Sequence, residues 1–207
     1  MRIYILRHGQ THWNKLLRWQ GNQDTILDET GVKQIHRSAE ELSLCGVSKI
    51  YTSPLKRAAM SAGILNRKIG VDIIYREGLR EIHLGKWEGF TTQEIIEKYG
   101  RLFVEWENNP VAQVGLGVEN MLDLQRRAYD EFCAIATQKI DKLAIVTHGT
   151  WTRCLLCKLL NIPLENRMNF SVDNAGISVI DCTKNGNGLS FTVITMNDIS
   201  HLLCDIV

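Results

Sequence analysis

The sequence has almost no net charge and no long hydrophobic run. Its 207 residues include 24 Lys and Arg against 23 Asp and Glu, a formal net charge of +1. Without an excess of positive charge, we expect neither nucleic acid nor a membrane surface as a partner. No apolar run reaches the roughly 20 residues that a transmembrane helix needs. A local cluster of positive charge that binds a small anion remains compatible with this overall neutrality.

Signals of secretion are also missing. The chain opens on an apolar, strand-like segment, without the basic region and hydrophobic core of a signal peptide. Several of the six cysteines lie within apolar helical or strand patterns, which is typical of buried thiols rather than of a disulfide scaffold. We therefore predict reduced cysteines and a cytoplasmic protein. The six are Cys45, Cys133, Cys154, Cys157, Cys182 and Cys204.

Strand-like and helical segments alternate along the chain, with no tandem repeat and no low-complexity linker. This alternation predicts one α/β domain over 1–207, a three-layer sandwich with a mostly parallel central sheet. An Asn-Gly turn near the C-terminus predicts an antiparallel element there. In the helix that starts near residue 53, we expect Ser53 as the N-cap and Pro54 as the first helical residue. Residues 91–137 are expected to be mainly helical, broken around "NNPVAQVGLG", with a small lid at about 85–120.

Two of the predicted strands end in the same dipeptide. The segments "RIYILRHG" and "KLAIVTHG" are both apolar and both finish in His-Gly. The carboxyl ends of parallel strands share one edge of a sheet, where ligands bind in such folds. His8 and His148 are therefore expected to meet, and the glycines after them, Gly9 and Gly149, allow a close approach of the backbone to a ligand.

The residues around this edge suit a phosphoryl group. The guanidinium of Arg7 matches phosphate oxygens bidentately. Arg57 is expected in the first turn of a helix, whose N-terminus also favours an anion. Asn14, Gln20 and Gly21 follow the first strand and would supply neutral donors. Each residue alone is more typical of a surface, loop or core position, and only their joint placement favours an anion site.

A metal or redox protein is the rival class of enzyme. His8 and His12 are four residues apart, and "CLLC" places Cys154 and Cys157 three apart. However, Gly9 and the end of the strand disrupt a helical histidine pair, and one CxxC is half of a four-cysteine zinc site. The leucines around these cysteines favour core packing. We predict no metal and no cofactor.

The ordered set of motifs resembles the histidine phosphatase superfamily, which includes cofactor-dependent phosphoglycerate mutase. The resemblance covers nearly the whole chain and implies a phosphoglycerate mutase-like fold and a metal-independent phosphatase. The motifs are "LRHGQTHWN", "RWQGNQDTILDETG", "YTSPLKRAAMSA", "LREIHLGKWEG", "AIVTHGT" and "DNAGISVI".

The resemblance also implies roles for individual residues. His8 would be the nucleophile that forms a phosphohistidine, which water then hydrolyses. Glu81 would protonate the leaving oxygen and later activate water, although without the resemblance it would not rank above Glu77 or Glu88. The positive charges of nearby arginines would lower the pKa of His8, so that it attacks as a neutral ring. The groups holding the phosphoryl oxygens would be Arg7, Asn14, Arg57 and His148, with Gln20, Gly21 and Gly149 in the substrate loops.

The substrate is less clear from the sequence. The compact segment after Glu81 is similar to the phosphatase branch of the family and predicts water as the acceptor, with a small phosphomonoester as substrate. Phosphoserine and alpha-ribazole phosphate are both compatible, and a homodimer stays open. A cofactor-dependent phosphoglycerate mutase and a non-catalytic module that binds a phosphorylated ligand are the alternatives. Arg101 is the strong cation of the expected lid, 99–120, which argues against a polyphosphate substrate. No role is assigned to Trp13, Trp19, Trp106 or His201.

Overall fold

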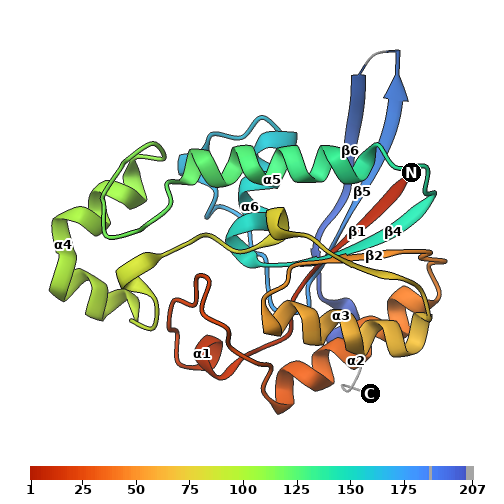
Figure 1. Ribbon diagram of the computed structural model, residues 1–207, viewed down its shortest axis with the longest axis horizontal. Helices are drawn as coiled ribbons and strands as arrows, with labels where there is room; N and C mark the ends of the chain where they lie inside the picture. The colour runs from red at the N-terminus through yellow and green to blue at the C-terminus, as the bar shows by residue number, and fades with distance from the viewer. Residues whose placement is uncertain (187, 204–207) are drawn as a thin grey trace.

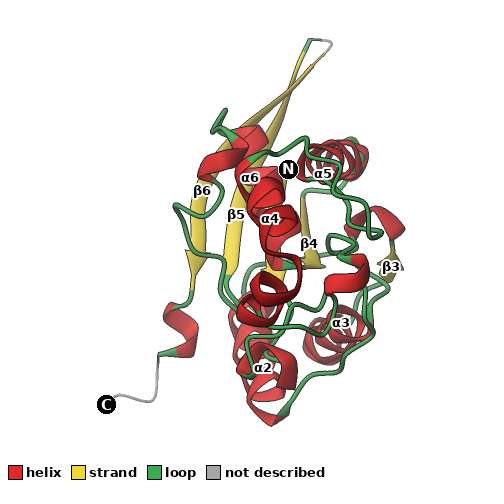
Figure 2. Cartoon of the chain, turned by 90° about the vertical axis from the view of Figure 1, so that its left-hand side faces the viewer, coloured by secondary structure: helices red, strands yellow, loops and turns green. Residues whose placement is uncertain are grey.

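A six-stranded sheet runs through the middle of the protein, with helices on both of its faces (Figures 1 and 2). The computed structural model describes residues 1–186 and 188–203. The strand order is β3-β2-β4-β1-β5-β6. The first four strands of this order pair in parallel, and β5 and β6 are antiparallel. The predicted three-layer α/β sandwich with an antiparallel C-terminal element is confirmed.

The elements follow the order expected from the sequence. The strands are β1 Arg2–Arg7, β2 Ile50–Thr52, β3 Ile73–Tyr75, β4 Lys142–Thr147, β5 Ile177–Asn185 and β6 Gly188–Asp198. The helices are α1 His12–Lys15, α2 Glu29–Ser43, α3 Lys56–Ile69, α4 Thr92–Asn108, α5 Met121–Ala136 and α6 Gly149–Leu159. Short 3₁₀ helices are η1 Glu77–Leu79, η2 Gly85–Trp87, η3 Leu164–Asn166 and η4 Ser200–Leu202.

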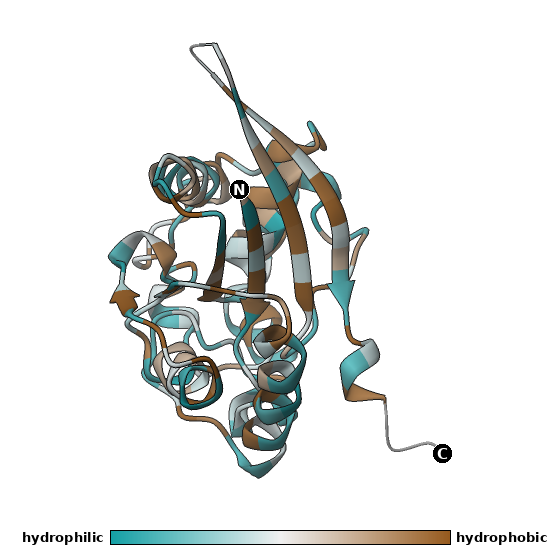
Figure 3. Cartoon of the chain, turned by 90° about the vertical axis from the view of Figure 1, so that its right-hand side faces the viewer, coloured by the Kyte–Doolittle hydropathy of each residue, from teal (hydrophilic) through white to brown (hydrophobic). Residues whose placement is uncertain are grey.

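The central strands β1 and β4 are hydrophobic on both faces because both faces are covered. Alternate side chains such as Ile5 and Ile145 pack against α5 and α6. Their neighbours, such as Leu6 and Val146, pack against α2 and α3 on the opposite face. The hydrophobic strands therefore lie between helices whose outer surfaces are more polar (Figure 3). This is the expected pattern for parallel strands buried between two helical layers.

The loop after β1 is held tightly against the start of α2. Asp28 caps this helix by accepting a hydrogen bond from the backbone N–H of Gly31 at 2.8 Å. A Cβ atom at Gly9 would lie 2.5 Å from the carbonyl oxygen of Gly31. Only glycine fits at this contact, so the backbone that follows His8 is fixed by packing as well as by its strand.

The predicted N-cap of α3 is wrong. The helix begins at Lys56, and Leu55 is its N-cap without a side-chain hydrogen bond. The hydroxyl of Ser53 instead lies 2.8 Å from Nε2 of His148 and accepts a long hydrogen bond, 3.3 Å, from the N–H of Leu55. The hydroxyl binds the histidine that follows the neighbouring strand β4 and does not cap the helix, whose first residue is Lys56 rather than the predicted Pro54.

The helix α4 lies beyond the end of the sheet, at the left of Figure 1. It has a kink at Gly100, where φ is 5°. Its inner side is anchored by aromatic rings: the ring centroid of Trp106 lies 5.3 Å from that of Trp87 and 5.7 Å from that of Trp19. The predicted break before α5 is confirmed, because 109–120 connect the two helices without regular structure.

Cys154 and Cys157 are fully buried on α6, as the surrounding leucines predicted. Cys45, Cys133 and Cys182 are also free thiols, and Cys204 lies outside the described residues. Within 1–186 and 188–203, none of the helices has the length and apolar character needed to cross a membrane.

An isoleucine-to-alanine substitution should lower the free energy of unfolding by different amounts on β4 and on β6. Ile145→Ala, at a side chain that is 0% exposed on β4, should lower the free energy of unfolding by about 2–5 kcal/mol. Ile194→Ala, 50% exposed on β6, is the control and should change it by about 0.5 kcal/mol or less. Urea denaturation measures both, and equal losses would contradict the assignment of β4 to the core.

Candidate active site

The pairing of β1 with β4 brings the two His-Gly segments together. These strands are parallel neighbours, and Arg7 is opposite Thr147 in their register. The N–H of His8 continues the pairing by donating to the carbonyl of Thr147 at 2.9 Å. The ring centroids of His8 and His148 are 5.2 Å apart. The predicted meeting of the two histidines is therefore confirmed.

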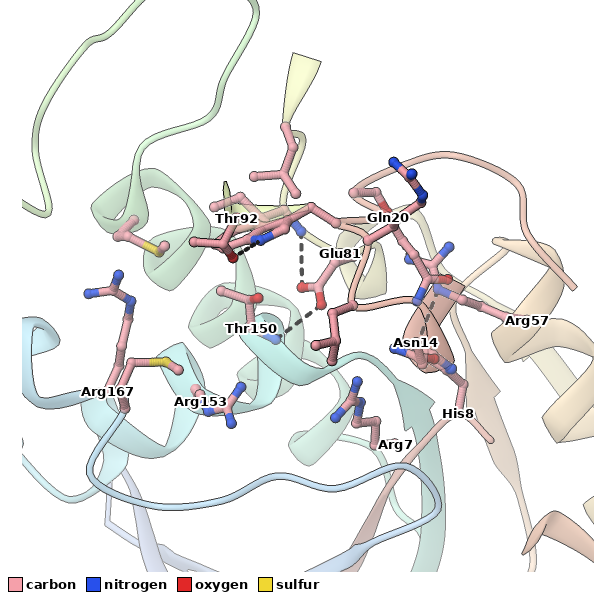
Figure 4. Close-up of a pocket in the computed structure, with 18 of the residues that line it drawn as sticks. Arg7, His8, Asn14, Gln20, Arg57, Glu81, Thr92, Thr150, Arg153 and Arg167 are labelled. Atoms are coloured by element: carbon pink, nitrogen blue, oxygen red, sulfur yellow. Dashed lines mark hydrogen bonds between the residues drawn. The ribbon is translucent and has the colours of Figure 1, made fainter. Parts of the chain in front are cut away.

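A cavity of about 470 Å³ opens at this edge of the sheet (Figure 4). Most of the predicted site residues line its wall, whereas His148 and Gly149 lie fully or nearly buried behind it. The lining members of the predicted set are Arg7, His8, Asn14, Gln20, Gly21, Arg57 and Glu81.

The ring of His8 is held in one tautomer. Its Nδ1 lies 2.7 Å from the carbonyl oxygen of Gly9, to which it donates, and its Nε2 accepts from Nε of Arg57 at 3.2 Å. Burial lowers the pKa of His8 well below its ordinary value, and the charges of Arg57 and Arg7 lower it further. The predicted direction is confirmed, although burial is a larger cause than the arginines. A neutral ring with its lone pair on Nε2 faces the cavity.

Two guanidiniums flank this ring, that of the buried Arg57 and that of the half-buried Arg7, and neither has a carboxylate partner among the described residues. Arg57 is 1% exposed and donates to the carbonyls of Gln23 at 2.8 Å and Gly21 at 2.7 Å. Arg7 donates to the carbonyl of Val172 at 2.5 Å, and its buried Nε has no hydrogen-bond partner among the described residues. Burial lowers the pKa of both arginines to about 10, so both are charged at neutral pH.

His148 and Gly149 lie behind the cavity wall and contact residues that line it or support it. Nε2 of His148 contacts Ser53, whereas its buried Nδ1 has no partner among the described residues. Burial also lowers the pKa of His148 well below its ordinary value, with the charge of Arg57 as the next cause. A Cβ atom at Gly149 would lie 3.3 Å from Nε of Arg7. Gly149 therefore makes room for the guanidinium beside the first turn of α6.

The polar loop residues have their oxygen atoms occupied. Oδ1 of Asn14 accepts from the backbone N–H of Thr11 at 3.1 Å. Oε1 of Gln20 accepts from the hydroxyls of Thr25 at 2.5 Å and Thr11 at 3.0 Å. Their amide nitrogens could therefore donate to a ligand. Gly21, with φ of 50°, instead turns its carbonyl to Arg57.

Glu81 is the one of the three candidate acids that lines the cavity. Its carboxylate accepts from the backbone N–H groups of Thr150 at 3.0 Å and Trp151 at 2.9 Å, in the first turn of α6, and from its neighbour Ile82 at 3.0 Å. By contrast, Glu77 forms an ion pair with Arg80, outside the cavity. The carboxylate of Glu88 accepts from the backbone N–H groups of Asn22 and Leu84 and from the side-chain amide of Gln23.

The sequence reasoning missed part of the cavity wall. Arg153 lies one helical turn after Gly149, and this i, i+4 spacing was a usable signal. Arg167 follows η3, from a segment without any motif. Arg101, the strong cation of the expected lid, is exposed and does not line the cavity. The charge of the cavity wall therefore does not follow from the cations of the lid. The other lining residues that were missed are Leu17, Arg18, Ile82, Leu84, Thr92, Glu107, Met121, Thr150 and Met168. Of the four residues left without a role, Trp19 lines the cavity.

The described residues show no group of three or more His, Cys, Asp or Glu side chains that could hold a metal ion. The residues around His8 are instead cations and neutral donors, and the carboxylate of Glu81 in the same wall is bound by backbone N–H groups. Such an arrangement is suited to an anion with several oxygen atoms, and a phosphoryl group has that shape and charge.

Comparison with known proteins agrees with this geometry. The family model of the histidine phosphatase superfamily (branch 1) matches residues 3–195, and the chain belongs to this family. "Phosphoserine phosphatase 1" of Hydrogenobacter thermophilus is 29% identical over 203 residues, 98% of this chain and 94% of that protein. "Probable phosphoglycerate mutase GpmB" of Proteus mirabilis is 29% identical over 211 residues, 98% of this chain and 95% of that protein. The solved structure of Bacillus stearothermophilus YhfR has a TM-score of 0.88 at 31% identity, covering 97% of this chain and 98% of that one.

The hydrogen bonds of His8 predict its state in solution. Because burial lowers its pKa, the ring should stay neutral as the pH falls through about 6.5, where an ordinary histidine becomes half protonated. Nitrogen-15 NMR of the imidazole should show a protonated Nδ1 and an unprotonated Nε2 between about pH 6 and 8. The signal is assigned by its loss in His8→Ala. An imidazolium at neutral pH, or the opposite tautomer, would contradict this description.

Proposed function

We propose that the protein is a metal-independent phosphomonoesterase that hydrolyses small phosphate monoesters through a phosphohistidine on His8. One observation carries this proposal: a neutral, buried imidazole presents its Nε2 lone pair between two arginines that have no carboxylate partner in the described part of the chain. A nucleophile beside unpaired cations is suited to attack on an anionic phosphoryl group. The family supports the same reaction class.

The first half of the reaction joins phosphorus to Nε2 of His8 and breaks its bond to the ester oxygen. The positive charges of Arg7 and Arg57 stabilise the charge that spreads over the other phosphoryl oxygens. Nε of Arg57, which donates to His8 in the free protein, would turn to a phosphoryl oxygen as the ester enters. Nδ1 of His148 and Nδ2 of Asn14 would complete the set of donors.

Glu81 would supply and then remove a proton. The leaving alkoxide is strongly basic and takes a proton from the carboxylic acid of Glu81. The resulting carboxylate then accepts a proton from the water that attacks the phosphohistidine. Splitting one displacement into two steps in this way is the general advantage of a covalent intermediate. The N–H groups of α6 hold Glu81 in position for both steps.

We also propose that about 85–120 acts as a lid within one domain of 1–207. Two residues of α4, Thr92 and Glu107, line the cavity, and Thr92 lies on the side away from His8 (Figure 4). The aromatic contacts of Trp106 hold this helix against Trp19 in the loop after β1. The lid would therefore contact the leaving group rather than the phosphoryl group.

A phosphoglycerate mutase is the second candidate, because the family also includes relatives with that name. The compact segment after Glu81 favours water as the acceptor. Phosphoserine and alpha-ribazole phosphate remain compatible substrates of the phosphatase. With 3-phosphoglycerate and catalytic bisphosphoglycerate, released phosphate should greatly exceed 2-phosphoglycerate, and dominant isomerisation would favour the mutase.

Hydrolysis of p-nitrophenyl phosphate after exhaustive chelation tests the proposed function. Phosphate release should continue in EDTA, should be inhibited by vanadate and should be abolished in His8→Ala, because only the ring of His8 supplies the attacking lone pair. Loss of activity that zinc or magnesium restores would contradict a metal-independent reaction. Tight phosphate binding without turnover would instead indicate a non-catalytic binding module.

The role of Glu81 predicts a dependence on the leaving group. Glu81→Gln should lower kcat/KM for alkyl phosphates by roughly 100-fold or more, because an alkoxide needs a proton as it leaves. The loss for p-nitrophenyl phosphate should be much smaller, because nitrophenolate leaves without protonation. Using kcat/KM restricts the comparison to steps up to formation of the phosphoenzyme. Equal losses for both substrates would mean that Glu81 only orders the start of α6.

A further inference from the structure

The cavity holds more positive charge than one phosphoryl group requires. Two of its arginines are neutralised by carboxylates: Arg18 pairs with Glu94 at 2.9 Å, and Arg167 pairs with Glu107. Arg7 and Arg57 are the two assigned to the phosphoryl oxygens in the proposed function. One lining arginine then remains without a role. The five arginines of the cavity wall are Arg7, Arg18, Arg57, Arg153 and Arg167.

The remaining residue is Arg153, on α6. In Figure 4 its guanidinium lies between those of Arg7 and Arg167, on the side of the cavity away from His8. Its Nε donates a long hydrogen bond, 3.4 Å, to the carbonyl oxygen of Phe170. In the described part of the chain, no carboxylate oxygen lies within 4.0 Å of its nitrogens.

The charged form of this guanidinium is disfavoured by its partly buried and partly apolar surroundings. Arg153 is half-buried, and Met121 and Met168 are apolar parts of the same cavity wall. Burial lowers the pKa of Arg153, and the charges of Glu81 and Asp173, which raise it, do not offset this loss of water. An anion bound in the cavity would stabilise this charge, and the phosphoryl group is already matched by Arg7 and Arg57.

We propose that Arg153 binds a second anionic group, carried by the leaving-group portion of the substrate. The inference rests on the proposed function and narrows its substrate class to phosphomonoesters that also carry a carboxylate or a comparable anion. A cavity of about 470 Å³ accommodates a small molecule of this type. A phosphomonoester whose leaving group is neutral would leave Arg153 unpaired and would be a poorer substrate.

Two esters that differ only in one terminal group test the inference. In 3-(phosphonooxy)propanoate a carboxylate replaces the terminal methyl group of propyl phosphate. The wild-type protein should favour the carboxylate by roughly 10- to 100-fold in kcat/KM, the range expected for a hydrogen-bonded charge pair. Arg153→Met should remove this preference mainly through KM, and Arg153→Lys should restore part of it.

Arg101→Met is the matched control, because Arg101 is an exposed arginine outside the cavity. It should leave the preference unchanged. No preference in the wild-type protein, or an equal preference in Arg153→Met, would overturn the inference and would make Arg153 a structural residue that binds Phe170.

Calorimetry separates this inference from the proposed function. Binding of 4-phosphonobutanoate should be tighter than that of butylphosphonate in the wild-type protein and equal to it in Arg153→Met. These phosphonates are not hydrolysed, so the comparison holds even if the protein hydrolyses neither ester. Hydrolysis without any difference in binding between the two phosphonates would refute the inference and leave the proposed function intact.

Discussion

The site depends on two arginines, one buried and one half-buried, that have no carboxylate partner within 1–186 and 188–203. Backbone carbonyls hold Arg7 and Arg57 in place, and a carbonyl oxygen has no net charge to cancel theirs. The same positive charges oppose protonation of His8 and attract an anion to it. A strong electrostatic site therefore exists in a chain whose net charge is only +1.

The position of Glu81 preserves this charge. Its carboxylate is close enough to raise the pKa of both Arg7 and Arg57 against the effect of burial, but it forms no ion pair with either. The backbone N–H groups at the start of α6 bind it instead. If Glu81 paired directly with an arginine, it would compete with the phosphoryl group. The helix terminus thus keeps an acid near the reaction and leaves both cations available.

The sequence allowed prediction of those parts of the site that follow from parallel strand pairing. His8 and His148 end adjacent buried strands, so their meeting required only the correct topology. The residues alone did not rank Glu81 above Glu77 or Glu88 as the catalytic acid. Its position in the cavity depends on backbone donors of α6, almost 70 residues further along the chain. Ser53 was misassigned because its hydroxyl binds a histidine from another strand. Arg167 lies after a short 3₁₀ helix, and no sequence motif connects that segment to the cavity.

Trapping of the covalent intermediate tests the central claim most directly. The protein would be mixed with radiolabelled p-nitrophenyl phosphate, quenched within its first turnover and digested for mass spectrometry. The account predicts an acid-labile, base-stable phosphoryl group on the peptide that contains His8, and none in His8→Ala. Label on a serine, cysteine or aspartate, or rapid phosphate release without any labelled protein, would contradict it.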